Sequence, residues 1–77
     1  MIIQNLEHAL QIRVGKRIQE IRTEKQISQQ DLAAKCNFEK SNMSRLEAGR
    51  ANATLSTIET VAKALNVPAI EFFKFKD

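Results

Sequence analysis

Residues 29–49, QQDLAAKCNFEKSNMSRLEAG, are the stretch that most constrains how this chain can fold. Leu32 and Cys36 lie four positions apart, and Met43 and Leu46 lie three apart. These are the spacings of one apolar face on each of two helices. Only a few residues separate the two pairs, so a tight turn must join the helices. The stretch therefore predicts two short helices that cross closely.

The ends of both helices can be predicted from residues that favour helix caps. Ser28 is a good N-cap, so the first helix should begin at the next residue. Asn37 should end that helix in the left-handed conformation that Gly and Asn tolerate best. Glu39 can cap the second helix as an acceptor, and Gly49 supplies the position after its end. We therefore expect the second helix over about residues 40–48.

The remaining elements follow from apolar spacing and caps. An amphipathic helix is expected over about residues 5–25, either unbroken or preceded by a separate arm, because Gly15 weakens its middle. Its apolar stripe consists of Leu6, Leu10, Val14, Ile18 and Ile21. Thr54 caps a further helix, Asn66 ends it, and Pro68 precedes a short last helix. The predicted fold class is all-α, a compact domain of five helices.

Length and composition agree with this fold class. The 77 residues allow one domain over residues 1–77, and 43% hydrophobic with 27% charged residues is typical of a globular chain. The net charge of +3 fits a nucleic-acid partner without requiring one. A single cysteine can form no internal disulfide, and there is no signal peptide or long apolar run. We therefore expect a cytoplasmic protein without a membrane span.

Consecutive blocks of the sequence carry a resemblance to a known family. Arg22 is followed in turn by KQISQQDLA, MSRLEAGR and TLSTIETVAKALNV. In this order the blocks resemble the lambda-repressor-like, Cro/C1-type (also called XRE-type) helix-turn-helix DNA-binding domains. The resemblance covers roughly residues 14–73 and implies a family-like core over residues 13–75, with residues 1–12 as a helix extension or arm. The chain departs from the usual family residues at Asn37, Glu39 and Ala53.

The resemblance implies a transcriptional regulator that binds double-stranded DNA sequence-specifically. An α-helix fits the major groove, and the N-terminal side chains of the second motif helix reach base edges. The expected base-contacting residues are Lys40, Ser41, Asn42, Ser44 and Arg45. Arg45 and Lys40 suit guanine, Asn42 suits adenine, and Glu39 would either repel phosphate or accept from a cytosine amine. The alternative for each residue is an ordinary solvated helix surface.

Other side chains of the motif should position the protein on DNA or fix its helices. Gln29 matches the phosphate-contacting glutamine of the family, at a helix N-terminus that favours anions. Arg50 and Asn52, in the following loop, are the other expected phosphate ligands. The resemblance also implies an ion pair between Arg22 and Glu47. We prefer this pair to a phosphate contact by Arg22, because a bidentate pair fixes helix orientation well.

A homodimer is expected, since one helix-turn-helix contacts only a few base pairs. The last helix is the most apolar segment outside the motif, and the predicted dimer interface there consists of Phe72, Phe73 and Phe75. By spacing, Ile70 and Phe73 should close the core, while Phe72 and Phe75 form a second pair left exposed. Alternatively these side chains simply cover the first helix. The rival dimer interface is the N-terminal arm, with Ile2, Ile3 and Leu6.

Other functions lack their chemical parts. His8 and Cys36 are each single, and no residues have metal-ligand spacing, so we expect no enzyme, metal or cofactor. RNA binding is disfavoured because the four Phe lack the spacing of a stacking platform and there is no Tyr or Trp. The main alternative is an interaction module that binds a partner protein, such as an antitoxin. Within the leading class, both controller proteins of restriction-modification systems and small phage-type repressors fit.

Overall fold

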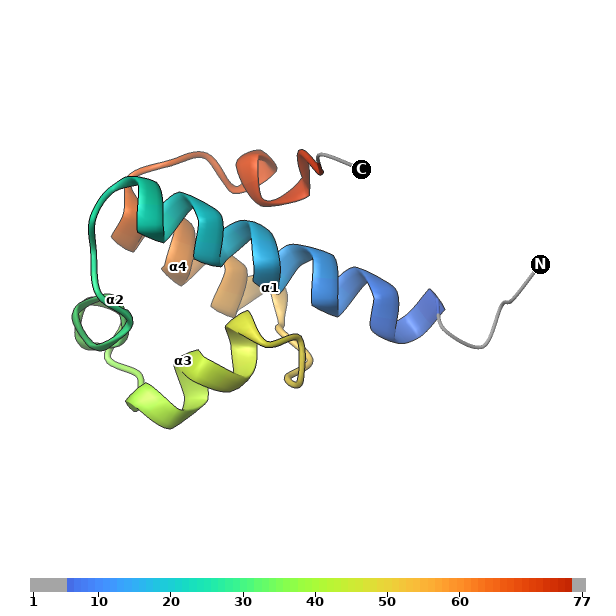
Figure 1. Cartoon of the computed structure of the whole chain (residues 1–77), viewed down its shortest axis with the longest axis horizontal. Coiled ribbons are helices and arrows are strands. Elements are labelled where there is room, and N and C mark those ends of the chain that lie inside the picture. The colour runs from blue at the N-terminus through green and yellow to red at the C-terminus, as the bar shows by residue number, and fades with distance from the viewer. Residues whose placement is uncertain (1–5, 76–77) are drawn as a thin grey trace.

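Four α-helices and a 3₁₀ turn make up the computed structural model, which describes residues 6–75. The elements in chain order are α1 (Leu6–Glu24), α2 (Gln29–Cys36), α3 (Lys40–Glu47), α4 (Leu55–Leu65) and η1 (Ala69–Phe73). Figure 1 shows α1 running across the molecule, with α3 below it, η1 above it and α4 behind it. The described residues form no β-strand, so the all-α prediction is confirmed. The fifth helix is a 3₁₀ turn and not an α-helix.

Local sequence sets the ends of the motif helices. The Ser28 hydroxyl accepts a hydrogen bond from the backbone N–H of Asp31 at 3.0 Å, and α2 begins at the residue after Ser28, as predicted. Asn37 (φ 60°) and Gly49 (φ 76°) follow α2 and α3 in the left-handed conformation. Glu39 precedes α3, but its side chain makes no cap hydrogen bond. The predicted Glu39 cap was therefore wrong, in keeping with the absence of Glu from the favoured N-cap residues.

The core lies where α1, α2, α3 and α4 meet. α2 packs against α3 and α4, and α1 packs against α3 and η1. The buried apolar side chains are Val14, Ile18, Ile21, Leu32, Ala33, Cys36, Met43, Leu46, Ile58, Val61, Ala62, Leu65 and Phe72. Every element contributes to this set, so the short motif helices are held by the whole fold and not by their own length.

The first helix is continuous through Gly15. From residue 6 onward the chain therefore forms one unbroken helix and not a separate arm followed by a helix. Its N-terminal turns extend beyond the other helices in Figure 1. Leu10, predicted to belong to the buried stripe, is consequently 50% exposed. Ile2 and Ile3 of the proposed N-terminal arm lie outside the described residues, as does the side chain of Leu6.

The C-terminal segment packs with the opposite face inward from the one predicted. Phe72 is fully buried and Phe75 packs against the core, whereas Ile70 and Phe73 are 61% and 40% exposed. The segment carries two apolar pairs with the same spacing, so spacing could not decide which pair faces the core. Phe72 is a core residue, and its assignment to a dimer interface was wrong.

Basic side chains of α1 hold the C-terminal segment in this orientation. Arg17 donates from Nε to the backbone carbonyl of Glu71 at 2.9 Å and lies 3.6 Å from the Glu71 carboxylate. Arg13 lies over the ring of Phe75, 4.4 Å from its centre. A hydrogen bond from Lys74 lowers the pKa of Glu71 below its ordinary value, so this carboxylate is ionised near neutral pH. The contacts of Arg13 and Arg17 therefore favour one of the two apolar pairs as the buried one, which apolar spacing alone could not do.

Candidate nucleic-acid interface

The residues of α3 divide into an outward and an inward set. Met43, Leu46 and Glu47 are buried against the rest of the fold. The exposed residues are Lys40, Ser41, Asn42, Ser44 and Arg45. These are the same five side chains that the sequence predicts to reach base edges. The structure therefore leaves all five exposed on α3, with two basic groups among them.

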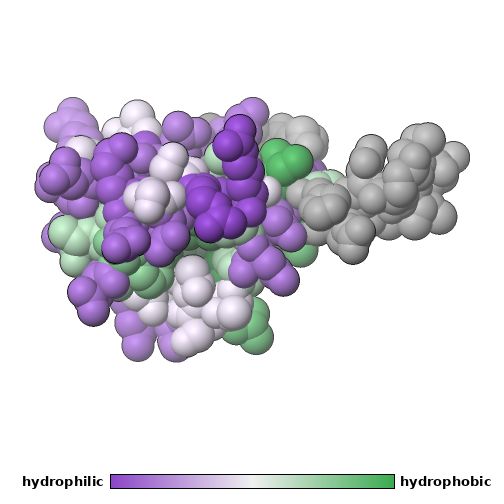
Figure 2. Space-filling model, turned by 90° about the horizontal axis from the view of Figure 1, so that it is seen from below, coloured by the Kyte–Doolittle hydropathy of each residue, from purple (hydrophilic) through white to green (hydrophobic). Residues whose placement is uncertain are grey.

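The face on which α3 lies is mostly hydrophilic. Figure 2 looks at this face from below the view of Figure 1, and purple atoms cover much of it. Glu39 is exposed immediately before α3, without a cap hydrogen bond. The Glu39 carboxylate therefore does not cap α3. It is exposed at the N-terminal end of this helix, next to Lys40 in the chain.

One buried carboxylate fixes the far end of α3. Arg22 donates to Glu47 from Nε at 2.7 Å and from Nη2 at 3.1 Å, so the predicted ion pair is present and bidentate. Arg22 also donates from Nη1 to the carbonyl of Ile27 at 2.8 Å, in the turn before α2. Gln29, expected to contact phosphate, donates from Nε2 to Oε1 of Glu47 at 2.9 Å. No pattern in the sequence predicted this last bond.

Two glycines let α1 approach the same end of α3. A Cβ atom on Gly15 would lie 2.4 Å from the carbonyl oxygen of Leu46 and 2.8 Å from that of Glu47. A Cβ atom on Gly49 would lie 2.6 Å from the Cα of Ile12. All three distances are shorter than real Cβ contacts, so α1 and the end of α3 pack with no room for a side chain. From the sequence, Gly15 is only a weak helix former, but a glycine inside an apolar stripe can also mark a close packing contact.

Gly15→Ala should lower the free energy of unfolding by about 1 to 3 kcal/mol. Alanine favours a helix by about 1 kcal/mol over glycine, but its Cβ would meet backbone oxygens that cannot rotate away. Urea unfolding measures the change. Lys16→Ala, at the exposed neighbouring position, is the matched control and should stay within about 0.5 kcal/mol of the parent. Parent-like stability of Gly15→Ala would contradict the close crossing.

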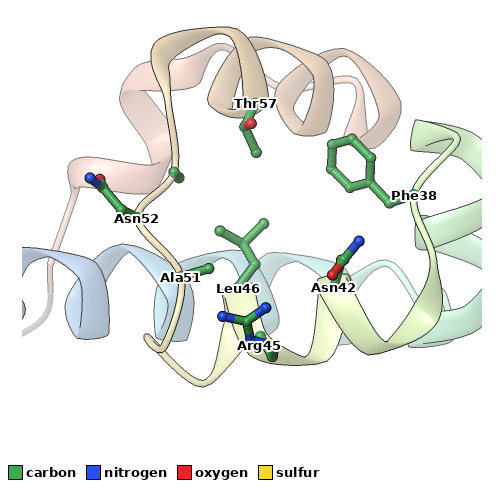
Figure 3. Close-up of a pocket in the computed structure, with 8 residues that line it drawn as sticks. Phe38, Asn42, Arg45, Leu46, Ala51, Asn52 and Thr57 are labelled. Atoms are coloured by element: carbon green, nitrogen blue, oxygen red, sulfur yellow. The ribbon is translucent and has the colours of Figure 1, made fainter.

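An open pocket of about 220 Å³ separates the flank of α3 from α4. Figure 3 shows Asn42 and Leu46 reaching from α3 toward Phe38 and Thr57, with Asn52 projecting away on the far side. Asn42 thus lies on the flank of α3 and not at its centre. Asn52, one of the two expected phosphate ligands in this loop, is exposed, and so is the other, Arg50.

A second surface is apolar and lies between α1, α4 and η1. Leu55 is 85% exposed, and Leu10 and Phe73 are each roughly half exposed. Together with the buried Val14 and Ile58 they line an open groove of about 250 Å³, which we call the apolar groove. None of the five exposed α3 residues lines it, whereas Asn52, an expected phosphate ligand, is among its lining residues. Of the residues predicted from the sequence to form the dimer interface, Phe72, Phe73 and Phe75, only Phe73 lines this groove.

The described residues offer little other chemistry. No group of three or more His, Cys, Asp or Glu among them could hold a metal ion. Cys36 is buried, which raises the pKa of its thiol and keeps it neutral near pH 7. No helix in the described part of the chain is long and apolar enough to cross a lipid bilayer.

Comparison with known proteins places this chain beside DNA-binding regulators. A family model described as Helix-turn-helix matches residues 18–72, from the middle of α1 into η1. The immunity repressor protein of Bacillus phage phi105 is 44% identical over 54 residues, which cover 70% of this chain. This chain spans only 38% of the length of that repressor.

Two solved structures of controller proteins have the same fold. The restriction-modification controller protein C.AhdI from Aeromonas hydrophila superposes with a TM-score of 0.82 at 33% identity, covering 86% of this chain and 96% of that one. The controller protein C.Esp1396I, solved as a tetramer in complex with its natural 35 base-pair operator, superposes with a TM-score of 0.77 at 35% identity. That match covers 84% of this chain and 86% of the other.

Proposed function

The chain belongs to the helix-turn-helix family, and on this basis we propose that it is a sequence-specific DNA-binding transcriptional regulator that acts as a homodimer. The division of α3 carries the proposal: Met43, Leu46 and Glu47 fix the helix, while its five exposed polar and basic side chains remain for a ligand. The relatives are a repressor and two controller proteins, one of them bound to operator DNA. We propose that the protein has no enzymatic activity. We also propose that it is located in the cytoplasm together with the DNA.

In the proposed complex, α3 lies in the major groove with its N-terminal half toward the bases. Arg45 and Lys40 donate to the O6 and N7 of guanine, and Ser41 and Ser44 contact bases of either kind. Asn42, on the flank of α3, donates to and accepts from adenine if a base edge lies on the pocket side. These contacts supply the sequence preference.

Phosphate contacts on both sides of α3 supply affinity without sequence preference. Arg50 and Asn52 are exposed in the loop that follows α3. Gln29 lies at the first position of α2, where backbone N–H groups and the helix dipole favour an anion. Because these contacts release counterions, binding to random duplexes should weaken steeply as salt is raised.

We propose that a second copy of the chain covers the apolar groove. Its exposed apolar residues, Leu10, Leu55 and Phe73, come from three separate elements and line the same groove. The related C.Esp1396I assembles as a tetramer on its operator. A two-fold dimer would place two copies of α3 about one helical turn, or roughly 34 Å, apart on DNA. Phe75 remains a proposed contributor, while Phe72 does not.

Leu55→Glu should give a folded monomer that loses tight operator binding but keeps weak binding to random DNA. Leu55 is the first residue of α4, and the helix dipole stabilises a carboxylate at this end of a helix. The fold should therefore tolerate the change. The dimer should not tolerate a buried charge in an apolar interface. Sedimentation of the parent and variant measures the assembly state. Ile70→Glu is the matched control, because Ile70 is exposed but does not line the apolar groove, and it should remain dimeric.

A dimeric Leu55→Glu variant would contradict the assignment of the apolar groove. If removal of residues 1–5 then dissociated the dimer, the N-terminal arm would be the interface. If the parent were a monomer that co-purified with a second polypeptide, the groove would serve a partner protein, as in the alternative of an interaction module. Each result therefore identifies a different occupant.

The proposed function is tested by selecting duplexes from a random pool with the parent protein. A sequence-specific regulator should recover one consensus with two related half-sites. Its affinity for that consensus at physiological salt should exceed its affinity for random duplexes by about 1000-fold or more. Recovery of no consensus, with equal affinity for all duplexes, would contradict sequence-specific regulation.

A further inference from the structure

The carboxylate of Glu47 connects the last residue of α3 to the first residue of α2. Its side chain is only 3% exposed, and its Oε1 accepts hydrogen bonds from both Arg22 and Gln29. Away from water, such charge-assisted bonds are stronger and better oriented than at the surface. Arg22 ties the same carboxylate to α1 and to the turn before α2. The position of the α3 terminus is therefore set by three other parts of the fold.

Gln29 differs from Arg22 in lying at the start of a helix. Its residue is only partly buried, and it lies at the N-terminus of α2, the end of the helix that favours an anion. A glutamine amide carries two N–H donors. One of them is used by Glu47 at 2.9 Å, which leaves the second for a phosphate oxygen. The same amide group can thus touch both the DNA backbone and the anchor of α3.

We infer that Gln29 is a positioning residue for α3, and that it contributes to base discrimination as well as to phosphate binding. This inference rests on the proposed function. Loss of the amide releases one of the bonds that orient Glu47, and α3 can then shift relative to α2. A shift of α3 weakens its contacts with base edges, whereas backbone contacts made by the loop after α3 are retained. Gln29 should therefore affect specificity, which a residue that contacts only phosphate does not.

The test compares Gln29→Ala with Gln30→Ala, the exposed neighbour on α2, for binding to the selected consensus duplex and to a random-sequence duplex. Gln29→Ala should reduce the ratio of the two affinities about tenfold, the equivalent of roughly one good base contact. Gln30→Ala should leave the ratio unchanged. A residue that only bound phosphate, or only stabilised the fold, would lower both affinities by the same factor. An unchanged ratio for Gln29→Ala therefore overturns the inference.

A second measurement needs no DNA and keeps the inference separate from the proposed function. Amide hydrogen exchange at Leu46, Glu47 and Ala48 should be faster in Gln29→Ala than in Gln30→Ala, because the end of α3 has lost an anchor. Equal exchange in the two variants overturns the positioning role. If the parent recovered no consensus but the exchange rates differed, the proposed function would fail while the contact between Gln29 and Glu47 would stand.

Discussion

Arg22→Met should lower the free energy of unfolding by about 3 to 5 kcal/mol, because it leaves the charge of Glu47 buried without its cationic partner. The pair is bidentate and both side chains are largely buried, so solvent cannot replace the lost hydrogen bonds. A domain of this kind has roughly 5 to 15 kcal/mol of stability in total. The variant should therefore be partly unfolded at modest urea concentrations, where the parent is native.

The double variant Arg22→Met, Glu47→Leu is the control for this prediction. Replacing both members of a buried ion pair with apolar residues of similar size is often neutral or stabilising. The double variant should therefore recover most of the stability that the single variant loses. The midpoint of urea unfolding measures this recovery, provided that the unfolding free energy falls with urea concentration at the same rate in all variants. A single variant within about 1 kcal/mol of the parent would contradict the buried character of the pair.

Phe72→Ala should cost about 3 to 5 kcal/mol, the range for removing a fully buried aromatic ring. Phe72 is the only buried residue of η1, and the ring packs into the same core as the buried residues of α1 and α4. Its loss leaves a cavity between these helices that the short 3₁₀ turn cannot close. Thermal or urea unfolding measures the effect.

Phe73→Ala is the matched control, since it removes the same ring from the next residue in the chain. Phe73 is 40% exposed on the described chain, so this variant should lose much less stability than Phe72→Ala, about 1 kcal/mol when both are measured on the monomer. A larger loss of stability in Phe73→Ala than in Phe72→Ala would show that Phe73 faces the core, which is the packing that apolar spacing predicted.

Local chemistry made much of the fold predictable. The caps at Ser28 and Asn37 and the glycine after α3 depend on backbone conformation within a few residues, so the sequence specifies them directly. The outward set on α3 was predictable for a similar reason. Once Met43 and Leu46 define the buried face, the exposed face follows from helical periodicity.

Predictions from the sequence were wrong or incomplete where two faces of a segment were chemically alike. They also missed packing that is determined by contacts between residues far apart in the chain. In the C-terminal segment both faces are apolar, and the contacts of Arg13 and Arg17 from α1 select the one that carries Phe72. The predicted cap at Glu39 failed although the helix begins where expected. The approach of Gly15 to α3 and the bond from Gln29 to Glu47 join residues far apart in the chain. Periodicity within one helix carries no information about either.

Selection from random duplexes with Arg45→Ala beside the parent tests most directly whether α3 reads DNA sequence. Arg45 is exposed on α3, and its removal should weaken binding to the parent consensus by about 1 to 3 kcal/mol. The consensus recovered by the variant should lose its preference at one base pair of each half-site and keep the others. Arg50→Ala, the control outside α3, should weaken all duplexes alike and keep the parent consensus. An unchanged consensus for Arg45→Ala would contradict the assignment of α3 as the helix that reads the bases.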